Sequence, residues 1–119
     1  MLHVHGIPTC GTVRKALAWL ASRGVPHRFV DLRASPPPRA TVAAWVAAAG
    51  SGPLRNTSGG SYRALGPEKD AWDDAAWTDA FTADPMLLRR PVITGDAPAD
   101  VRLVGFRGDD DTIARALGL

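Results

Sequence analysis

Hydrophobic and polar residues recur with a helical period in one early stretch of the chain. Between Gly11 and about Arg23 the apolar positions are spaced by three and four residues, as on one face of a helix, at Val13, Ala16, Leu17 and Leu20. Gly24 follows and suits the left-handed residue that ends many helices. Short β-prone runs, Met1–Gly6 and His27–Leu32, flank the stretch. The pattern predicts a strand–helix–strand unit whose helix begins just after Cys10.

The middle of the chain is predicted to be helical. A second apolar stripe begins after the prolines at 36–38, which a first helical turn tolerates, and closes at Gly50. Its members are Val42, Trp45, Val46 and Ala49. Residues 51–61 are rich in Gly and Ser and are expected to form a loop. Another helix is expected from about Asp74 to Ala83, ended by Pro85. Over residues 56–73 the periodicity is weak.

The last part of the chain is predicted to return to strands. Pro91–Gly95 and Val101–Gly105 are short apolar runs joined by a turn. Asp109–Asp111 then open a final helix, since acidic residues suit the positive end of the helix dipole. A metal site would instead need oxygen ligands distributed around a loop, so no metal is expected. The predicted order is βαβ, a helical middle, and ββα.

Composition describes an ordinary globular chain with one constraint. Its 119 residues match one domain, and 45% are hydrophobic and 22% charged. We expect a single domain over 1–119 with a helical insertion at about 36–85. Cys10 is the only cysteine, which excludes an intramolecular disulfide and a cysteine-based zinc cluster. A lone thiol fits a reducing compartment, so a cytoplasmic protein is expected.

The positive charge is small and dispersed. The formal net charge is +2, and the twelve arginines and two lysines are scattered. A nucleic-acid binder usually gathers them into one patch, so no nucleic-acid partner is expected. The tryptophans are expected in or near the core, at Trp19, Trp45, Trp72 and Trp77. No stretch reaches 18 apolar residues, so we expect no membrane contact. The protein is also expected to be a monomer.

Cys10 occupies a position that favours a reactive thiol. It is predicted to lie in the turn between the first strand and the first helix, beside the unpaired N–H groups of the helix start. These groups lower a cysteine pKa, and the thiolate is the reactive form. Arg14, one turn further on, adds positive charge. The alternative is a small buried hydrophobic side chain, which is the usual state of a free cysteine.

The dipeptide Arg90–Pro91 precedes the third predicted strand. A residue before proline favours extended backbone, and X–Pro is the only common place for a cis peptide bond. A cis-proline here would hold the backbone beside the cysteine loop. The alternative is an ordinary edge-strand proline flanked by solvated arginines.

Taken together, these segments resemble the arsenate reductase (ArsC) family, in the ArsC/Spx/YffB group and closest to its YffB branch. The resemblance covers nearly the whole chain in order. It rests on His5–Ala16, Gly24–Asp31, Asn56–Thr57, Tyr62–Leu65, Arg89–Ile93 and Val104–Phe106. It implies an α/β thioredoxin-like fold (βαβ…ββα) with a helical insertion, which matches the predicted order of elements.

The resemblance also implies a chemistry. Cys10 matches the family's nucleophilic cysteine, with the amides of Gly11 and Thr12 and the charge of Arg14 stabilising its thiolate. Arg90 matches the arginine that binds the oxyanion before the cis-proline Pro91. The implied activity is a glutathione-linked thiol reductase acting on a small anionic or thiol substrate, with arsenate or a disulfide as candidates. No cofactor is expected to stay bound; glutathione is the expected co-substrate and glutaredoxin the recycling partner.

Some family positions depart from the pattern. A second oxyanion arginine would fall at Arg55 or at Asn56, depending on a one-residue choice in alignment. A third falls at Gly105, with Arg107 two residues on as a substitute. The histidine of arsenate reductases, four residues before their cysteine, is Gly6 here. His5 is adjacent, but a one-residue slip on a strand would point it to the other face.

Two other functions fit the same residues. One is a regulator that binds RNA polymerase, as Spx does, but the Cys-x-x-Cys switch of typical Spx proteins is excluded because Val13 stands three residues after Cys10. The other is a non-catalytic binding module with a degraded site. A Cys10 pKa near the ordinary value of about 8.5 would favour the binding module.

Overall fold

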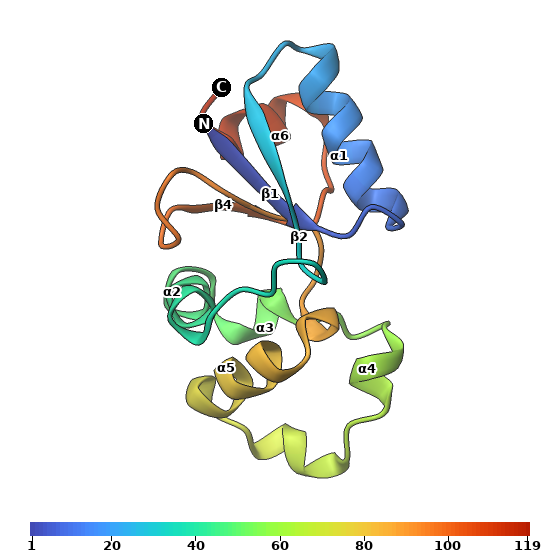
Figure 1. The fold of residues 1–119 in the computed structure, drawn as a ribbon, viewed down its shortest axis with the longest axis vertical. Coiled ribbons are helices and arrows are strands. Elements are labelled where there is room, and N and C mark those ends of the chain that lie inside the picture. The colour runs from blue at the N-terminus through green and yellow to red at the C-terminus, as the bar shows by residue number, and fades with distance from the viewer.

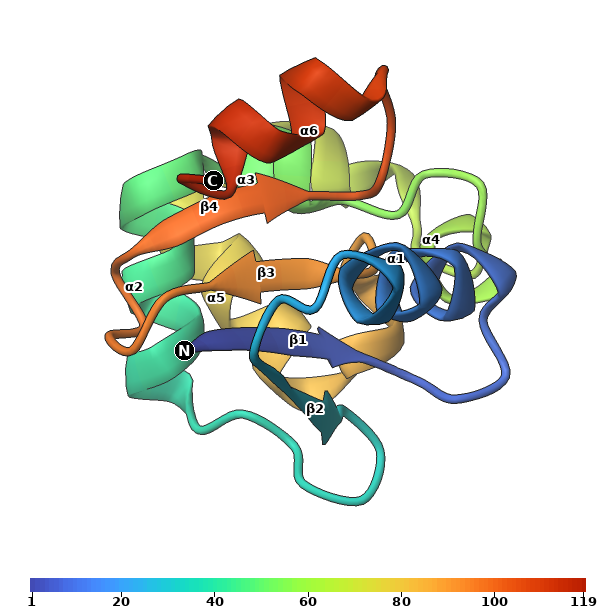
Figure 2. The same ribbon diagram turned by 90° about the horizontal axis from the view of Figure 1, so that it is seen from above.

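A four-stranded mixed sheet forms the centre of the computed structural model, which describes residues 1–119. Its strands are β1 (Leu2–Gly6), β2 (His27–Asp31), β3 (Val92–Thr94) and β4 (Val101–Val104), in the order β2-β1-β3-β4. β1 pairs in parallel with β2 and antiparallel with β3, and β3 pairs antiparallel with β4 (Figure 2). This confirms the thioredoxin-like fold.

Helix α1 (Gly11–Ser22) forms where the apolar stripe predicted it. Val13, Ala16 and Leu20 are fully buried on its inner face. Gly24 adopts φ +63° just beyond the helix, so a residue without a Cβ ends it as expected. The predicted strand–helix–strand unit is therefore present with nearly the expected bounds.

Two layers of helices cover the two faces of the sheet (Figure 1). One face packs against α1 and α6 (Asp110–Ala116), through a core that includes Val4, Leu20 and Ile93. The other face packs against the helices between β2 and β3, through Trp45, Phe81 and their neighbours. Asp109 caps α6 by accepting a hydrogen bond from the Thr112 N–H at 2.8 Å, so the acidic run is a helix start.

Helices fill the stretch between β2 and β3. They are α2 (Arg39–Ala49), α3 (Ser51–Leu54), α4 (Gly60–Arg63), η1 (Pro67–Ala71), α5 (Asp74–Ala83) and η2 (Pro85–Leu87). Helix α5 has the predicted bounds. The loop expected at 51–61 is wrong in part, because α3 and the start of α4 lie within it. Leu54 is fully buried, and tertiary packing holds this Gly- and Pro-containing segment in a short helix.

Two of the four tryptophans that were expected in or near the core are completely buried. Trp45 is fully buried and Trp77 is 1% exposed. Trp72 meets Trp77 edge-on, with ring centroids 4.9 Å apart, and Trp19 is half-buried on α1. Among the helices, none combines the length and the apolar character that crossing a membrane requires.

Candidate active site

Cys10 lies at the N-cap of α1, directly after the turn that follows β1. Its N–H donates to the Ile7 carbonyl at 3.2 Å, and its carbonyl accepts from the Arg14 N–H at 3.0 Å, which begins the helical ladder. The thiol is partly buried and makes no capping hydrogen bond of its own within the helix. The turn after β1 therefore places one half-exposed sulfur at the N-terminal, positive end of the α1 dipole.

The surroundings of Cys10 favour its thiolate. Partial burial is the largest influence and opposes ionisation, but the N–H groups of Val13 and Thr12 and the Arg90 guanidinium together outweigh it. The pKa of Cys10 is consequently lowered below the usual value for a cysteine.

The lowered pKa predicts an early rise of thiol reactivity with pH. Alkylation of the native protein by iodoacetamide should reach half its maximal rate below the ordinary thiol pKa of about 8.5. The urea-unfolded protein, in which those N–H groups and Arg90 no longer surround the sulfur, is the matched control and should show the ordinary value. Because the folded-state pKa is the lower one, the thiolate's contribution to stability is present above the unfolded pKa and is lost as the pH falls through the folded value. Identical midpoints for native and unfolded protein would contradict the expectation.

Arg90 reaches the sulfur from the segment before β3. The Arg90–Pro91 peptide bond is cis, as expected. The Arg90 Nη1 donates to the carbonyl oxygens of Met86 at 3.1 Å and Leu88 at 3.2 Å, which fixes the guanidinium against η2. Its Nε is buried and has no hydrogen-bond partner in the protein. A planar guanidinium held in one orientation beside Cys10 is suited to bind an anion there.

Cys10 and Arg90 open into a polar cleft of about 430 Å³. Four segments that are distant in sequence form its walls: the start of α1, the α3–α4 connection, the strand entry before β3, and the turn after β4. The lining residues are Cys10, Thr12, Asn56, Thr57, Ser58, Arg89, Arg90, Gly105, Phe106 and Arg107. Three arginines therefore face one cleft that contains the only thiol.

The cleft receives Asn56 and not Arg55. Arg55 has an extended backbone and bridges Leu88 in antiparallel fashion, with the Arg89 N–H donating to the Leu54 carbonyl at 2.7 Å and the Asn56 N–H to the Leu87 carbonyl at 2.8 Å. Neighbouring side chains on an extended segment point to opposite sides, so only one of the two can face the thiol. Arg55 instead lies over the Trp77 ring at 4.2 Å and donates to the Ser51 hydroxyl. This corrects the expectation that Arg55 lines the site.

The other expected residues divide between the cleft and its surroundings. Thr12 and Arg107 line it, whereas Gly11 and Arg14 do not. The side chain of Arg14 is exposed and is not among the groups that lower the Cys10 pKa. The amide that acts in place of Gly11 is that of Val13, because the first free N–H groups converge on the N-cap residue from the second and third helical positions.

Four cleft residues were not among the expected site residues: Thr57, Ser58, Arg89 and Phe106. The Ser58 hydroxyl donates to the Asn56 side-chain oxygen at 3.3 Å, which orders this connection. Arg89 packs beneath Gly105, where an added Cβ would lie 3.2 Å from its Cδ and where φ is +76°. The Gly-rich polar run 56–60 is the sequence feature that could have indicated these residues. Its weak periodicity predicted no helix or strand, so it was not linked to the site.

Gly6 leaves no room for a side chain. A Cβ there would lie 2.5 Å from the Cγ2 of Val13, which is fully buried. His5 points to the opposite face of the sheet, where its ring meets Trp45 edge-on with centroids 4.8 Å apart. The face expected from strand alternation is thus confirmed, and the site has no histidine at the Gly6 position.

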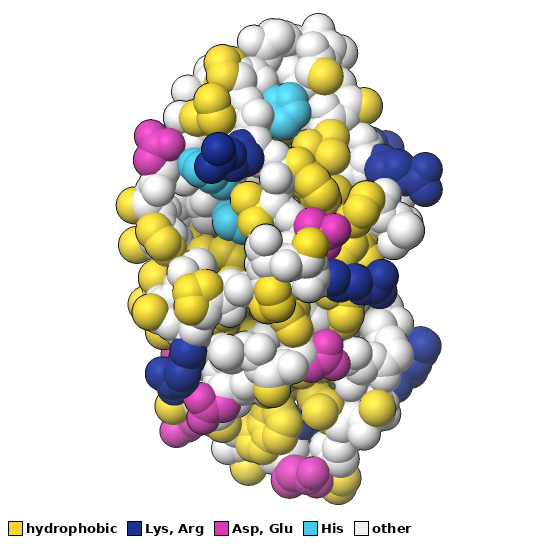
Figure 3. Space-filling model, viewed as in Figure 1, with side chains coloured by type: hydrophobic (Ala, Val, Ile, Leu, Met, Phe, Trp, Pro, Cys, Tyr) yellow, Lys and Arg dark blue, Asp and Glu magenta, His cyan; other side chains and the backbone are white.

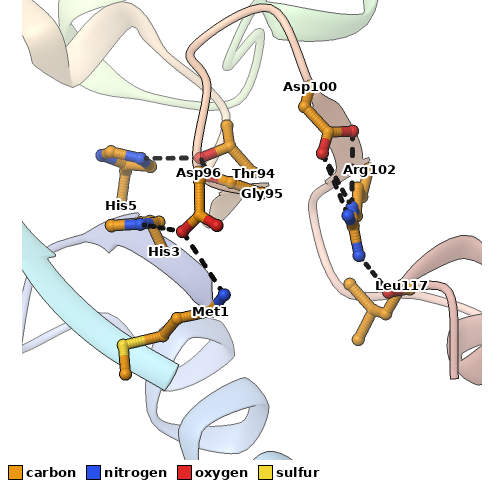
Figure 4. Close-up of polar contacts among 9 residues, drawn as sticks. All are labelled: Met1, His3, His5, Thr94, Gly95, Asp96, Asp100, Arg102 and Leu117. Carbon is orange, nitrogen blue, oxygen red and sulfur yellow. Dashed lines mark hydrogen bonds and ion pairs between the residues drawn. The ribbon is translucent and has the colours of Figure 1, made fainter. Parts of the chain in front are cut away.

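His5 belongs to a separate polar cluster on that opposite face (Figure 4). Its Nε2 lies 3.3 Å from the Thr94 hydroxyl, and the His3 Nε2 lies 3.4 Å from the Asp96 carboxylate. Burial, and secondarily the charge of His3, lower the pKa of His5 from 6.5 to about 4. His5 is therefore neutral at pH 7.

This pKa predicts a loss of stability in weak acid. The unfolded chain takes up a proton on His5 near pH 6.5 and the folded protein only near pH 4, so stability should fall as the pH drops between these values. With partial exposure taken into account, we expect a loss of about 1–2 kcal/mol. Urea unfolding at pH 7 and pH 4.5 measures it. His5→Gln should remove most of the difference and His27→Gln should keep it; an equal difference in all three proteins would contradict the assignment.

On the face of the molecule shown in Figure 3, the Lys and Arg side chains are dispersed and form no single positive patch. The structure contains no group of three or more His, Cys, Asp or Glu side chains able to hold a metal ion.

The fold is thioredoxin-like, and its one thiol lies at a helix start beside the arginine that precedes the cis-proline. The model of the ArsC family matches residues 5–111. The chain belongs to the ArsC family, which confirms the family resemblance.

Individual relatives agree with this assignment. An arsenate reductase of Rhizobium meliloti is 33% identical over 98 residues, which cover 81% of this chain and 69% of the relative. An uncharacterised protein of Haemophilus influenzae is 31% identical over 107 residues, covering 89% and 91% of the two chains. Among solved structures, the YFFB protein is 31% identical with a TM-score of 0.84, and the match covers 98% of this chain and 99% of that one.

Proposed function

We propose that this protein is a glutathione-linked thiol reductase that uses Cys10 as its nucleophile. The observation that carries the proposal is the sulfur itself, held at the N-cap of α1 between the Thr12 and Val13 amides and Arg90, with a lowered pKa. A thiolate of this kind attacks a disulfide or an oxyanion centre faster than an ordinary thiol at neutral pH. The arginines of the cleft favour an anionic substrate.

The proposed cycle needs a second thiol from outside, because Cys10 has no partner cysteine. The Cys10 thiolate attacks the glutathionyl sulfur of a mixed disulfide, the substrate S–S bond breaks, and the departing thiolate takes up a proton. A glutathione thiolate then attacks the glutathionyl sulfur held on Cys10. The products are the substrate thiol, oxidised glutathione and the regenerated Cys10 thiolate, so one glutathione thiol is oxidised for each substrate sulfur that is reduced to a thiol.

The same site accommodates an arsenate cycle. Reduction of arsenate to arsenite takes two electrons, which Cys10 and one glutathione supply by ending as a mixed disulfide while one arsenate oxygen leaves as water. Glutaredoxin or a second glutathione then opens that disulfide. The name of the Rhizobium meliloti relative supports this substrate, whereas Asn56 stands where a second oxyanion arginine was expected. We therefore place disulfides and arsenate in the same test.

The site gives less support to the two alternative functions, a regulator that binds RNA polymerase and a non-catalytic binding module. Val13 is fully buried against Gly6, so the position three residues after Cys10 holds a packing residue. A non-catalytic binding module does not require the lowered Cys10 pKa or the Arg90 guanidinium that lines the cleft beside the sulfur.

Two measurements test the proposed function. The purified protein is incubated with oxidised glutathione, and its intact mass should increase by one glutathionyl group; protein whose thiol was first alkylated is the control and should not change. An NADPH-coupled assay with glutathione, glutathione reductase and glutaredoxin then compares arsenate with a small mixed disulfide. Absence of the adduct, or equal adduct on the alkylated protein, would contradict the mechanism.

A further inference from the structure

A second hollow adjoins the cleft that contains Cys10. It has about 430 Å³ and is lined by Lys15, Trp19, Phe106, Arg107, Gly108, Asp110 and Ile113. Phe106 and Arg107 line both hollows, so the two hollows adjoin at this pair of residues. The second hollow runs between α1 and the connection from β4 to α6. A molecule that reacts at Cys10 can extend into it without leaving the protein surface.

The floor of the second hollow is aromatic and held in place. The Trp19 indole N–H donates to Asp110 at 3.0 Å, and the Arg23 guanidinium lies 3.9 Å from the Trp19 ring centroid. Phe106 meets Trp19 edge-on with ring centroids 6.1 Å apart. Three separate contacts therefore fix Trp19, which makes it a preformed surface for the uncharged part of a ligand.

The charge of the second hollow is positive. Asp110 is its only acidic residue, and the Arg23 guanidinium already pairs with that carboxylate at 2.7 Å. Lys15 and Arg107 are exposed and form no ion pair with any residue of the protein. Two cations without a partner thus stand beside an aromatic floor, which suits a carboxylate attached to a short chain.

We propose that the second hollow binds one carboxylate-bearing arm of glutathione, with the carboxylate between Lys15 and Arg107 and the peptide over Phe106 and Trp19. The dimensions agree: Lys15 lies about 7.5 Å along α1 from Cys10 at 1.5 Å per residue, and a tripeptide extends to roughly 10 Å. The inference deepens the proposed function by assigning the thiol co-substrate its own subsite. The Asn56–Ser58 side of the cleft is thereby left to the anionic substrate.

The test uses S-methylglutathione, whose blocked sulfur cannot exchange with Cys10, so that binding is measured apart from reaction. Titration into ¹⁵N-labelled protein should shift the amide signals of Lys15, Phe106 and Arg107 and the Trp19 indole signal. Lys15→Gln and Arg107→Gln should each raise the dissociation constant about three- to fivefold, as expected for one exposed ion pair. Arg28→Gln, which removes an exposed cation on β2, is the matched control and should bind as the wild type does.

Shifts confined to residues 56–58, or Lys15 and Arg107 variants that bind like the control, would overturn the subsite. Failure of the proposed function looks different: the protein would form no glutathionyl adduct, yet S-methylglutathione would still shift the signals of the second hollow. Adduct formation without those shifts would keep the reductase and remove the subsite.

Discussion

A Cys10→Ser variant is expected to lose thiol–disulfide turnover down to the uncatalysed background, a fall of roughly 10³-fold or more. A serine hydroxyl cannot form the mixed disulfide, and no second cysteine is present to replace the thiol. A serine at this N-cap can accept from the same Thr12 and Val13 N–H groups that face the sulfur, so the start of α1 is expected to be retained. The variant should therefore fold normally while its reaction stops.

The NADPH-coupled assay measures this loss, with far-UV circular dichroism and urea unfolding as checks that the fold is unchanged. Binding of S-methylglutathione provides a further control, because a site that has lost only its nucleophile keeps its ligand contacts. Retention of more than a few per cent of the wild-type rate by a correctly folded Cys10→Ser protein would remove Cys10 from the mechanism.

The parts of the fold that could be predicted are those set by local pattern. The stripe of α1 and the acidic cap of α6 depend on residues a few positions apart, and both form as expected. The error lies at 51–61, where α3 and the start of α4 replace a loop. There the burial of Leu54 decides the conformation, and that burial depends on helices far away in the sequence.

Only those parts of the site that lie within one short segment of the chain could be predicted from the sequence. Cys10 and the turn before α1 form one short segment, and the Arg90–Pro91 dipeptide carries its own conformational signal. The choice between Arg55 and Asn56 required the pairing of residues 54–56 with 87–89, which no local pattern reveals. Arg14 was wrongly expected to stabilise the thiolate. It lies one helical turn after Cys10 in the sequence, but its side chain is exposed to solvent.

Arg90→Gln is expected to have the second-largest effect. Its loss removes both a group that lowers the Cys10 pKa and the fixed fork that faces the cleft. The alkylation midpoint of Cys10 should therefore rise, and the rate with oxidised glutathione at pH 7 should fall by roughly 10²-fold, comparable to loss of one preorganised donor to an anion. Arg90→Lys retains the charge but not the planar fork, and should lie between Gln and wild type.

The pH profile decides what Arg90 does, because the residue also has a structural contact. Its Nη1 holds the carbonyls of Met86 and Leu88, so a substitution will weaken η2 to some extent whatever its role in chemistry. A purely structural residue would lower the rate without moving the alkylation midpoint of Cys10. A shifted midpoint in Arg90→Gln, with Arg28→Gln unchanged, assigns the guanidinium to the thiolate; an unshifted midpoint limits Arg90 to holding the entry to β3.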